Sequence, residues 1–565
     1  MPGPNTHVHS GNSLPSLPEE HNTGSGTENT TPPGARSPPP RRRTSRAAHL
    51  GLASLSLNDP NHNHTSYNTY GGSYRLSSKS PRFDMPAAHD ARARTPRPRN
   101  KSFGMRNPAE LALDFIIVGA GISGLATGFA LAQAGHRVQI FDRNDGIHQR
   151  STGVRVPPNL SKILAEWGLQ DELLSKATKC RKSVFLSLET NERVGVLEWQ
   201  EDVIKETGGD FFLMHYDDLY SMLYNLAASK GVKITFNTTI TSVQFDASKQ
   251  RPFVTLGSGS VVYADMVIGA DGLKSIVREV VTGEQDAPND SGMCYVSFVV
   301  PAEKLKADPD WGKWVGVSEW PIWMGTGRNV LGYPIRNGQE YCIHAFHPDS
   351  LIKISPVERT SESWTDIIPT DAILHEDSHP SIHRIFSSVP DAIRVKYNPR
   401  EAIDDWVDES GTIMLIGEAA HPLMPCTIHN LALAVEDAAV LGVLLSHLHS
   451  RRQLPQLLEA FQDLRFSRIQ QAHQSELNNA GFTTLPPGEH RDARDAGLRQ
   501  SLLAPSAEGT EWNDDRLREQ WEGISFAFGY DALEAAEDWW LKWGALVGGG
   551  QTEAVEVAIE KIQLT

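Results

Sequence analysis

The sequence has little cysteine and no long apolar run, and both shortages narrow the classes of protein to consider. Its four cysteines, Cys180, Cys294, Cys342 and Cys426, lie far apart and form no CxxC pair. This spacing argues against a zinc site or a dense disulfide framework, so we expect no metal and a reducing, cytoplasmic environment. No stretch of about 18 uncharged apolar residues occurs, and the N-terminus lacks an apolar core of signal-peptide length. We therefore expect no stable membrane span.

Negative charge exceeds positive charge outside the first 106 residues. That segment holds 14 Lys/Arg against 6 Asp/Glu, whereas the whole chain of 565 residues carries −16, which leaves −24 for the remainder. An acidic body with a basic tail does not indicate a nucleic-acid partner. Residues 1–108 are rich in Ser, Pro, Asn and Gly and are predicted to be a disordered tail. Its PPPRRRTSR run at 38–46 leaves nuclear targeting open beside the simpler interpretation of a solvated linker.

Apolar periodicity predicts an α/β core beginning near residue 111. The pattern favours strands at 113–118, 138–141, 261–268 and 412–416, and a helix at 122–134. The region from 183 to about 398 is rich in Trp, Tyr, Val and turn residues, and it predicts an inserted lobe of antiparallel strands. Beyond residue 455 the pattern is helical and charged, and the final aromatic cluster, Trp539, Trp540 and Trp543, is expected to dock as a helix.

A glycine motif connects the first predicted strand to the first predicted helix. Its residues are Gly119, Ala120, Gly121, Ile122, Ser123 and Gly124. Gly119 suits a tight turn, and Gly121 lets the backbone approach a pyrophosphate at the helix N-terminus. Asp142 ends the next strand, 18 residues beyond Gly124, where a carboxylate can accept hydrogen bonds from a ribose. This motif alone leaves FAD and NAD as alternatives.

Two further motifs follow predicted strands. GADGLKSIVR occupies 269–278, where Ser275 is predicted to cap the next helix, and GEAAHPLMP occupies 417–425, followed by LAVEDA at 433–438. In order and spacing, the three motifs resemble those of FAD-dependent aromatic hydroxylases, the class A flavoprotein monooxygenases, of the salicylate-hydroxylase-like and fungal type. The similarity extends over about 113–445. No second GxGxxG with strand and helix flanks appears, which fits enzymes that lack a dedicated NAD(P)H domain.

The resemblance implies a fold and a reaction. The fold is a Rossmann-like FAD-binding domain with an inserted antiparallel-sheet substrate domain, a helical C-terminal extension and a disordered N-terminal tail. The reaction uses NAD(P)H and O₂ to hydroxylate a small phenolic molecule through a flavin C4a-hydroperoxide. We expect a monomer or a homodimer. The implied parts are a tail (1–108), an FAD-binding domain (109–182, 211–290 and 397–475), a substrate domain (183–210 and 291–396) and the extension (476–565).

The resemblance also assigns residues to the cofactor. The implied FAD contacts are Gly119, Ala120, Gly121, Ile122, Ser123, Gly124, Asp142, Arg143, Thr152, Gly153, Arg155, Asp271, Gly272, Gly417, Glu418, Pro425, Asn430 and Leu431. No general base is identified, and Pro425, His421 and His429 are weak catalytic candidates. A structural turn histidine is the favoured interpretation of His429. His215 is expected to pack at a helix start. For Trp323, Tyr333 and Tyr341, a place in the core is favoured over a place in the pocket lining.

The sequence departs from the family pattern in four places. Glu418 stands where the family has Asp, and Ile428-His429-Asn430 replaces a glycine-containing turn, with Asn430 expected to tolerate a left-handed conformation. Tyr216 stands where an Arg is usual, and Val296 follows Tyr295 where many relatives carry Arg. Arg155 is a candidate to replace the lost positive charge. Two alternatives stay open: a flavin oxidase or dehydrogenase on the same fold, and an FAD-binding protein with impaired turnover.

Overall fold

The computed structural model describes residues 107–146, 152–199, 201–354, 364–373, 375–502 and 523–547. The predicted disordered tail and its basic run lie outside the described residues, except for Asn107 and Pro108. Within these ranges, no helix combines the length and the apolar character that crossing a membrane requires.

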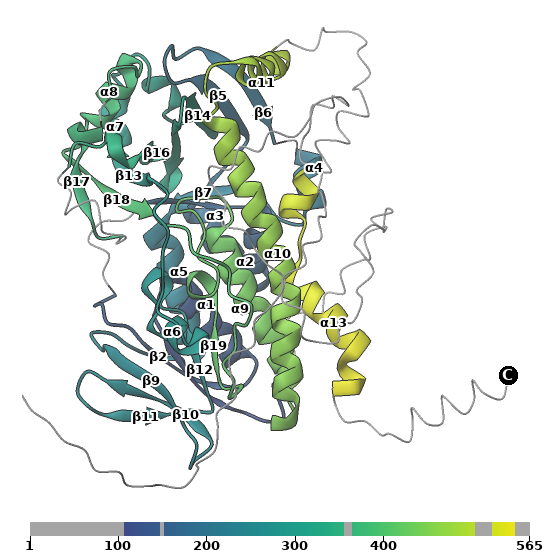
Figure 1. Ribbon diagram of the computed structural model, residues 1–565. Helices are drawn as coiled ribbons and strands as arrows, with labels where there is room; N and C mark the ends of the chain where they lie inside the picture. The colour runs from purple at the N-terminus through teal and green to yellow at the C-terminus, as the bar shows by residue number, and fades with distance from the viewer. Residues whose placement is uncertain are drawn as a thin grey trace, which may run out of the picture. The chain divides into compact units, whose positions relative to one another are not determined.

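A five-stranded parallel sheet forms the core of the first lobe (Figure 1). Its strand order is β19-β12-β1-β2-β8. Its strands are β1 (Asp114–Val118), β2 (Arg137–Phe141), β8 (Lys233–Thr235), β12 (Met266–Gly269) and β19 (Ile413–Leu415). β1 lies in the middle, and its apolar side chains are buried on both faces, as is usual for parallel sheets covered by helices. The predicted strands at 113–118, 138–141 and 412–416 are confirmed to within one residue at each end.

Helices cover this sheet. The elements that pack around it are α1 (Ile122–Gln133), α5 (Tyr216–Ser229), α6 (Ile276–Thr282) and α9 (Asn430–Ser446). α9 is apolar and buried on nearly all sides because α1, α2 (Pro158–Glu166), α10 (Leu454–Thr483) and α13 (Ala532–Val547) all contact it. The remaining helices are α3 (Gln170–Lys176), α4 (Glu201–Glu206), α7 (Ala302–Leu305), α8 (Pro380–Phe386), α11 (Glu489–Arg499) and residues 523–528.

An eight-stranded sheet forms the second lobe and confirms the predicted antiparallel insertion. Its order is β17-β18-β13-β16-β15-β14-β5-β6, and every neighbouring pair is antiparallel except β14 with β5. The strands are β5 (Lys182–Ser187), β6 (Arg193–Glu198), β13 (Met293–Pro301), β14 (Glu319–Gly325), β15 (Arg328–Ile335), β16 (Glu340–Pro348), β17 (Ile367–Pro369) and β18 (Asp391–Tyr397). Side chains alternate between two buried clusters, so both faces of the sheet are covered.

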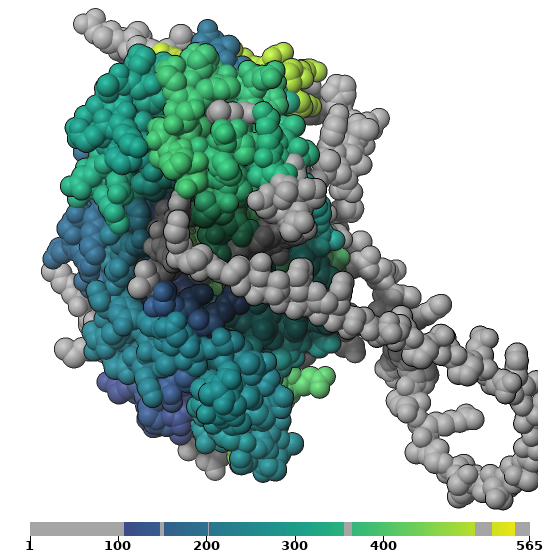
Figure 2. All heavy atoms as spheres, turned by 90° about the vertical axis from the view of Figure 1, so that its left-hand side faces the viewer, coloured from purple at the N-terminus to yellow at the C-terminus, as the bar shows by residue number. Residues whose placement is uncertain are grey.

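Two small sheets complete the fold, and one of them corrects a prediction. The predicted single strand at 261–268 is wrong, because the chain forms β11 (Val261–Tyr263) in a sheet with β9 (Ile240–Asp246) and β10 (Arg251–Leu256), and only then enters the parallel sheet as β12. Asp265 lies at this change of sheet and accepts a hydrogen bond from the backbone of Asp114. Figure 2 shows the teal residues of this small sheet at the bottom of the molecule. The other small sheet joins β3 (Gly153–Val156), β7 (Phe212–His215) and β4 (Thr178–Lys179).

The tryptophan-containing helix docks, as predicted. In α13, Trp539 and Trp540 are partly buried against the largest core cluster, and the Trp540 ring stacks on the ring of His447 at a centroid distance of 4.2 Å. Leu541 on the same helix is 80% exposed, so only one face of α13 enters the core.

Candidate active site

The carboxyl ends of four parallel strands meet at one edge of the first sheet. Val118 at the end of β1 is in register with Phe141 of β2 and with Gly269 of β12, and Gly269 is in register with Leu415 of β19. The first motif and Asp142 directly follow two of these ends, the second motif begins with Gly269 itself, and the third begins two residues after Leu415. Ligands of open α/β sheets bind in the crevice at this edge, so the fold places all the predicted nucleotide-contacting segments together.

The glycines of the three motifs allow these segments to touch. A Cβ on Gly119, whose φ is 101°, would lie 2.5 Å from the carbonyl oxygen of Ala270 in the second motif. A Cβ on Gly417, whose φ is 58°, would lie 2.5 Å from Oγ of Ser123 in the first motif. Both positions combine a left-handed backbone with a close approach, and only glycine accommodates the two together.

Asp142 binds the backbone of the first motif. Its carboxylate accepts hydrogen bonds from the amide of Ala120 at 2.7 Å and from the amide of Asn144 at 2.7 Å. A carboxylate retains further lone pairs after two such bonds, so a ribose contact stays compatible with this geometry. The neighbouring Arg143 is exposed at the surface.

The start of α1 suits a phosphate group. Gly121 is the N-cap, no side chain caps the helix, and its first turn contains no acidic residue. A Cβ on Gly121 would meet nothing within 4 Å, whereas a Cβ on Gly124 would lie 2.0 Å from the carbonyl oxygen of Gly119. The Ser123 hydroxyl is buried and has no hydrogen-bond partner among the described residues. An open, uncapped helix start with an unsatisfied hydroxyl fits the pyrophosphate of a dinucleotide.

Asp271 of the second motif organises the next helix. Its carboxylate accepts hydrogen bonds from Oγ of Ser275 at 2.5 Å and from the amide of Ile276 at 2.9 Å. Ser275 in turn accepts from the amide of Arg278, which confirms the predicted cap of α6. Burial raises the pKa of Asp271. The carboxylate therefore has a structural task in addition to any cofactor contact.

Glu418 lies next to the second motif. A Cβ on Gly272 would be 3.6 Å from Oε2 of Glu418. Burial raises the pKa of Glu418, although the charges of His421 and Arg400 act in the opposite direction. Asp271 and Glu418 thus form two partly desolvated carboxyl groups on neighbouring strand ends, a typical feature of functional sites.

The turn after Pro425 differs from the predicted one. The left-handed residue is Cys426, with a φ of 53°, and Asn430 is instead the first residue of α9. The Asn430 side chain closes the turn: its amide donates to the carbonyl of Met424 at 3.0 Å, and its carbonyl accepts from Oγ1 of Thr427 at 2.5 Å. Asn430 therefore does not use the left-handed conformation that it was expected to tolerate. Leu431 follows it and is partly buried on the main core.

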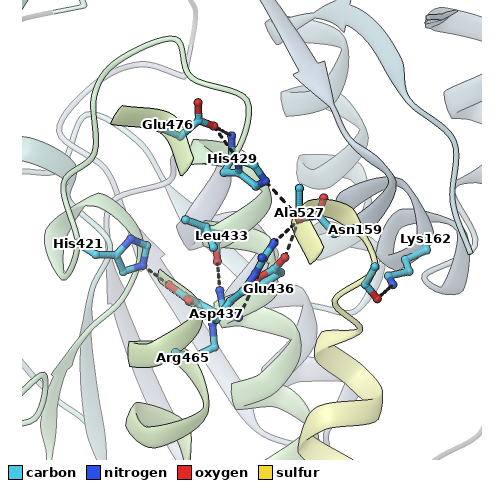
Figure 3. A network of polar contacts seen from close by, with 12 residues as sticks. Asn159, Lys162, His421, His429, Leu433, Glu436, Asp437, Arg465, Glu476 and Ala527 are labelled. Atoms are coloured by element: carbon cyan, nitrogen blue, oxygen red, sulfur yellow. Dashed lines mark hydrogen bonds and ion pairs between the residues drawn. The ribbon is translucent and has the colours of Figure 1, made fainter. Parts of the chain in front are cut away.

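The two candidate histidines are held by carboxylates. Nε2 of His421 pairs with Asp437 at 2.7 Å, and Nδ1 of His429 pairs with Glu476 at 2.7 Å (Figure 3). Nε2 of His429 faces the carbonyl of Ala527 at 3.3 Å, and its ring stacks on Phe528. Both ring nitrogens of His429 therefore have protein partners, as expected of a histidine that fixes a turn.

A buried charge network lies behind the third motif, and the sequence did not reveal it. Arg465 of α10 pairs with Asp437 at 2.7 Å and with Glu436 at 2.8 Å, and all three side chains are fully buried (Figure 3). Asp437 also accepts a hydrogen bond from the amide of Gly417 at 3.0 Å. Burial alone would raise the pKa of Asp437, but His421 and Arg465 hold this pKa below its usual range. Arg465 thus positions the third motif through Asp437.

The segment at 152–155 connects the two lobes. The amide of Gly153 donates to Sγ of Cys342 at 3.1 Å, and Oγ1 of Thr152 is hydrogen-bonded to Oγ of Ser297. Arg155 donates to the carbonyl of Cys426. β3 therefore ties strands β13 and β16 of the larger sheet to the turn after Pro425.

The other aromatic and histidine predictions are confirmed. Trp323, Tyr333 and Tyr341 are at most 1% exposed and belong to the cores of the larger sheet. His215 is the N-cap of α5, and its Nδ1 accepts a hydrogen bond from the amide of Asp217 at 3.2 Å.

Comparisons with known proteins agree with this geometry. Residues 112–476 match the family model described as an FAD binding domain. The FAD-dependent monooxygenase cfoG of Aspergillus candidus is 32% identical over 372 residues, which are 63% of this chain and 82% of that protein. The FAD-bound structure of CtdE with a substrate covers 77% of this chain and 100% of its own, with 18% identity and a TM-score of 0.62. A salicylate hydroxylase substrate complex covers 75% and 97%, with 20% identity and a TM-score of 0.58.

Proposed function

Because the chain belongs to the FAD-binding-domain family of flavin-dependent monooxygenases, we propose that it hydroxylates a small aromatic, phenolic molecule with NAD(P)H as reductant and O₂ as oxidant. FAD is the cofactor of this oxidoreductase. The observation that carries the proposal is the meeting of three glycine motifs at adjacent ends of parallel strands, where Gly119 approaches Ala270 and Gly417 approaches Ser123.

The residues at this edge fit FAD chemically. The uncapped start of α1, with Gly121 and Ser123, would take the pyrophosphate, and Asp142 would take a ribose hydroxyl. Asp271 and Glu418 would face the ribitol side, and the turn after Pro425 would lie against the isoalloxazine. When bound and reduced by NAD(P)H, FAD would supply the activation of O₂, one atom of which enters the ring while the other leaves as water.

The protein's own contribution is to hold the ring and exclude water. Asp437 holds Nε2 of His421, and Glu476 and the carbonyl of Ala527 hold the two ring nitrogens of His429, so we assign both histidines to positioning the third motif and its turn. Pro425 remains a candidate for contact with the reacting part of the cofactor, because it begins the turn that would lie against the isoalloxazine. Buried apolar and aromatic side chains on the facing sheet would orient the ring.

Two measurements test the proposal. The visible spectrum of the purified protein should show bound flavin, and NAD(P)H consumption should rise with particular phenols in a panel and match the amount of hydroxylated product. NAD(P)H oxidation that never yields such a product would instead support an oxidase or dehydrogenase on the same fold. Bound FAD that NAD(P)H cannot reduce would support a flavoprotein with impaired turnover.

A further inference from the structure

Arg155 is a buried cation that has no carboxylate partner in the described parts of the chain. Among the described arginines with buried side chains, six form ion pairs, and only Arg155 and Arg328 do not. Arg155 is 5% exposed. Burying an unpaired charge costs several kcal/mol, so a ligand that brings a negative charge to such a place would be stabilised there.

The immediate surroundings of Arg155 leave part of its hydrogen-bonding capacity unused. One terminal nitrogen donates to the carbonyl of Cys426, and its Nε is buried without an acceptor. The guanidinium lies over the ring of Trp320, 5.1 Å from its centroid, and 6.0 Å from the ring centroid of Tyr333. Aromatic faces stabilise a cation but do not neutralise it.

The nearby ionisable groups do not supply the missing negative charge. Burial would raise the pKa of Glu476, but its hydrogen bond to His429, the charge of His429 and the charge of Arg155 together lower it. Glu476 is already committed to His429 through both the backbone and the ring. Burial and the charge of Arg155 lower the pKa of His344 well below its usual value, so this histidine is neutral at pH 7.

Side chains close to Arg155 form a polar cluster on one face of the larger sheet. Tyr333 and His344 share a hydrogen bond of 2.7 Å, and Cys342 lies 3.5 Å from the same ring nitrogen of His344. The other ring nitrogen, Nδ1, is buried without a partner. Buried polar groups are normally satisfied, so this cluster indicates a place where a ligand supplies acceptors and donors.

We propose that Arg155 is the anion receptor of the substrate site, and that the enzyme selects aromatic rings bearing a carboxylate over rings that lack one. The inference rests on the proposed function, because it takes the ligand at this cluster to be the substrate. The contacts of Arg155 described above lie on the turn after Pro425 and on strands β14 and β15, which favours a ligand held against the larger sheet. The sequence resemblance assigned Arg155 to FAD instead. Binding experiments on Arg155 variants distinguish a contact with FAD from a contact with the substrate.

Arg328 provides a matched control. It is buried to 6% exposure on β15 and, like Arg155, has an Nε without a partner. However, Arg328 lines a cavity of about 20 Å³ among residues of the opposite core. A volume of that size holds one or two water molecules and excludes an aromatic ring.

The test is binding of paired ligands to the FAD-loaded protein. Salicylate and its neutral analogue salicylamide are titrated by calorimetry into the wild type, Arg155→Gln, Arg155→Lys and Arg328→Gln. A charged hydrogen bond predicts a wild-type preference for the acid of roughly 10- to 100-fold. Arg155→Gln should reduce the two affinities to within about threefold of each other, Arg155→Lys should keep most of the preference, and Arg328→Gln should retain it fully.

Three results would overturn the inference. These are equal affinity of the wild type for acid and amide, no binding of either, and a preference that survives Arg155→Gln. Loss of FAD in Arg155→Gln with recovery in Arg155→Lys would assign the charge of Arg155 to flavin binding. That result would also overturn the inference. By contrast, an Arg155-dependent preference for the acid without any hydroxylated product would leave this inference standing and count only against the monooxygenase reaction.

Discussion

The turn that follows β1 and the turn that follows β19 lie at the same edge of the parallel sheet, but different forces hold them. The first is fixed by close backbone approach and one carboxylate, because Gly119 lies against Ala270 and the Ala120 amide donates to Asp142. The second is fixed by buried carboxylates on the helices that follow it, because Asp437 of α9 and Glu476 of α10 hold His421 and His429.

This difference explains how the chain tolerates an altered third motif. The first turn depends on the absence of side chains, so nearly every substitution there disturbs it directly. The second turn depends on buried ion pairs, which can hold a loop whose own residues have changed. Each substitution below tests one side of this comparison.

The largest effect is expected from removing Arg465. The Arg465→Met variant leaves Glu436 and Asp437 buried with less compensation, which should lower the free energy of unfolding by about 3 to 5 kcal/mol. Unfolding in denaturant, monitored by circular dichroism, measures this free energy. Arg137→Met, which breaks an exposed ion pair with Asp114, is the control and should change little. A nearly unchanged midpoint for Arg465→Met would show that the network does not hold the third motif.

The next largest effect is expected at Gly119. In Gly119→Ala, the new Cβ meets backbone atoms at a φ of 101°, so strain and overlap should cost about 2 to 4 kcal/mol. Gly121→Ala is the matched control, since its Cβ enters open space. That variant should keep the stability of the apoprotein and bind FAD less tightly in a fluorescence titration. Equal FAD affinity of Gly121→Ala and wild type would contradict the phosphate assignment at α1.

These two sites also show what could be predicted from the sequence. Strand, glycine turn and helix follow one another within about 20 residues, so local pattern located β1, α1, β2 and Asp142 to within a residue or so. The partners of His429 are 47 and 98 residues away, at Glu476 and Ala527. No spacing rule connects them, because helix packing alone brings these residues together.

A continuous apolar run also did not predict which sheet its residues join. The stretch at 261–268 is continuous in composition, but at Asp265 the chain passes from one sheet to another. Asp265 is fixed there by Asp114, Arg251 and Arg451, which come from distant segments. Likewise, the pattern beyond residue 455 predicted a charged helix, but it did not indicate that Arg465 within α10 is fully buried.

A pH titration of stability separates Glu418 from the network. Because burial raises its pKa above the unfolded value of about 4.3, the unfolded state releases its proton first, and the apoprotein should lose stability as pH rises through the interval between the two values. Glu418→Gln should remove that loss and be more stable than the wild type above the interval. Unfolding midpoints of the wild type and Glu418→Gln, measured from pH 4 to 8, test this prediction. Parallel curves for the two proteins would contradict it.

The smallest effect should come from placing a glycine in the third turn. Cys426 has a φ of 53°, which costs a residue with a Cβ about 1 to 2 kcal/mol, whereas glycine loses about 0.5 to 1 kcal/mol in chain entropy. Cys426→Gly should therefore stabilise the protein by up to about 1 kcal/mol relative to Cys426→Ala, which keeps the Cβ and removes the thiol. Denaturant midpoints of the two variants measure the difference. A less stable glycine variant would mean that the buried charges behind the turn, rather than its local conformation, already set its energy, and the two turns would then differ even more than the structure indicates.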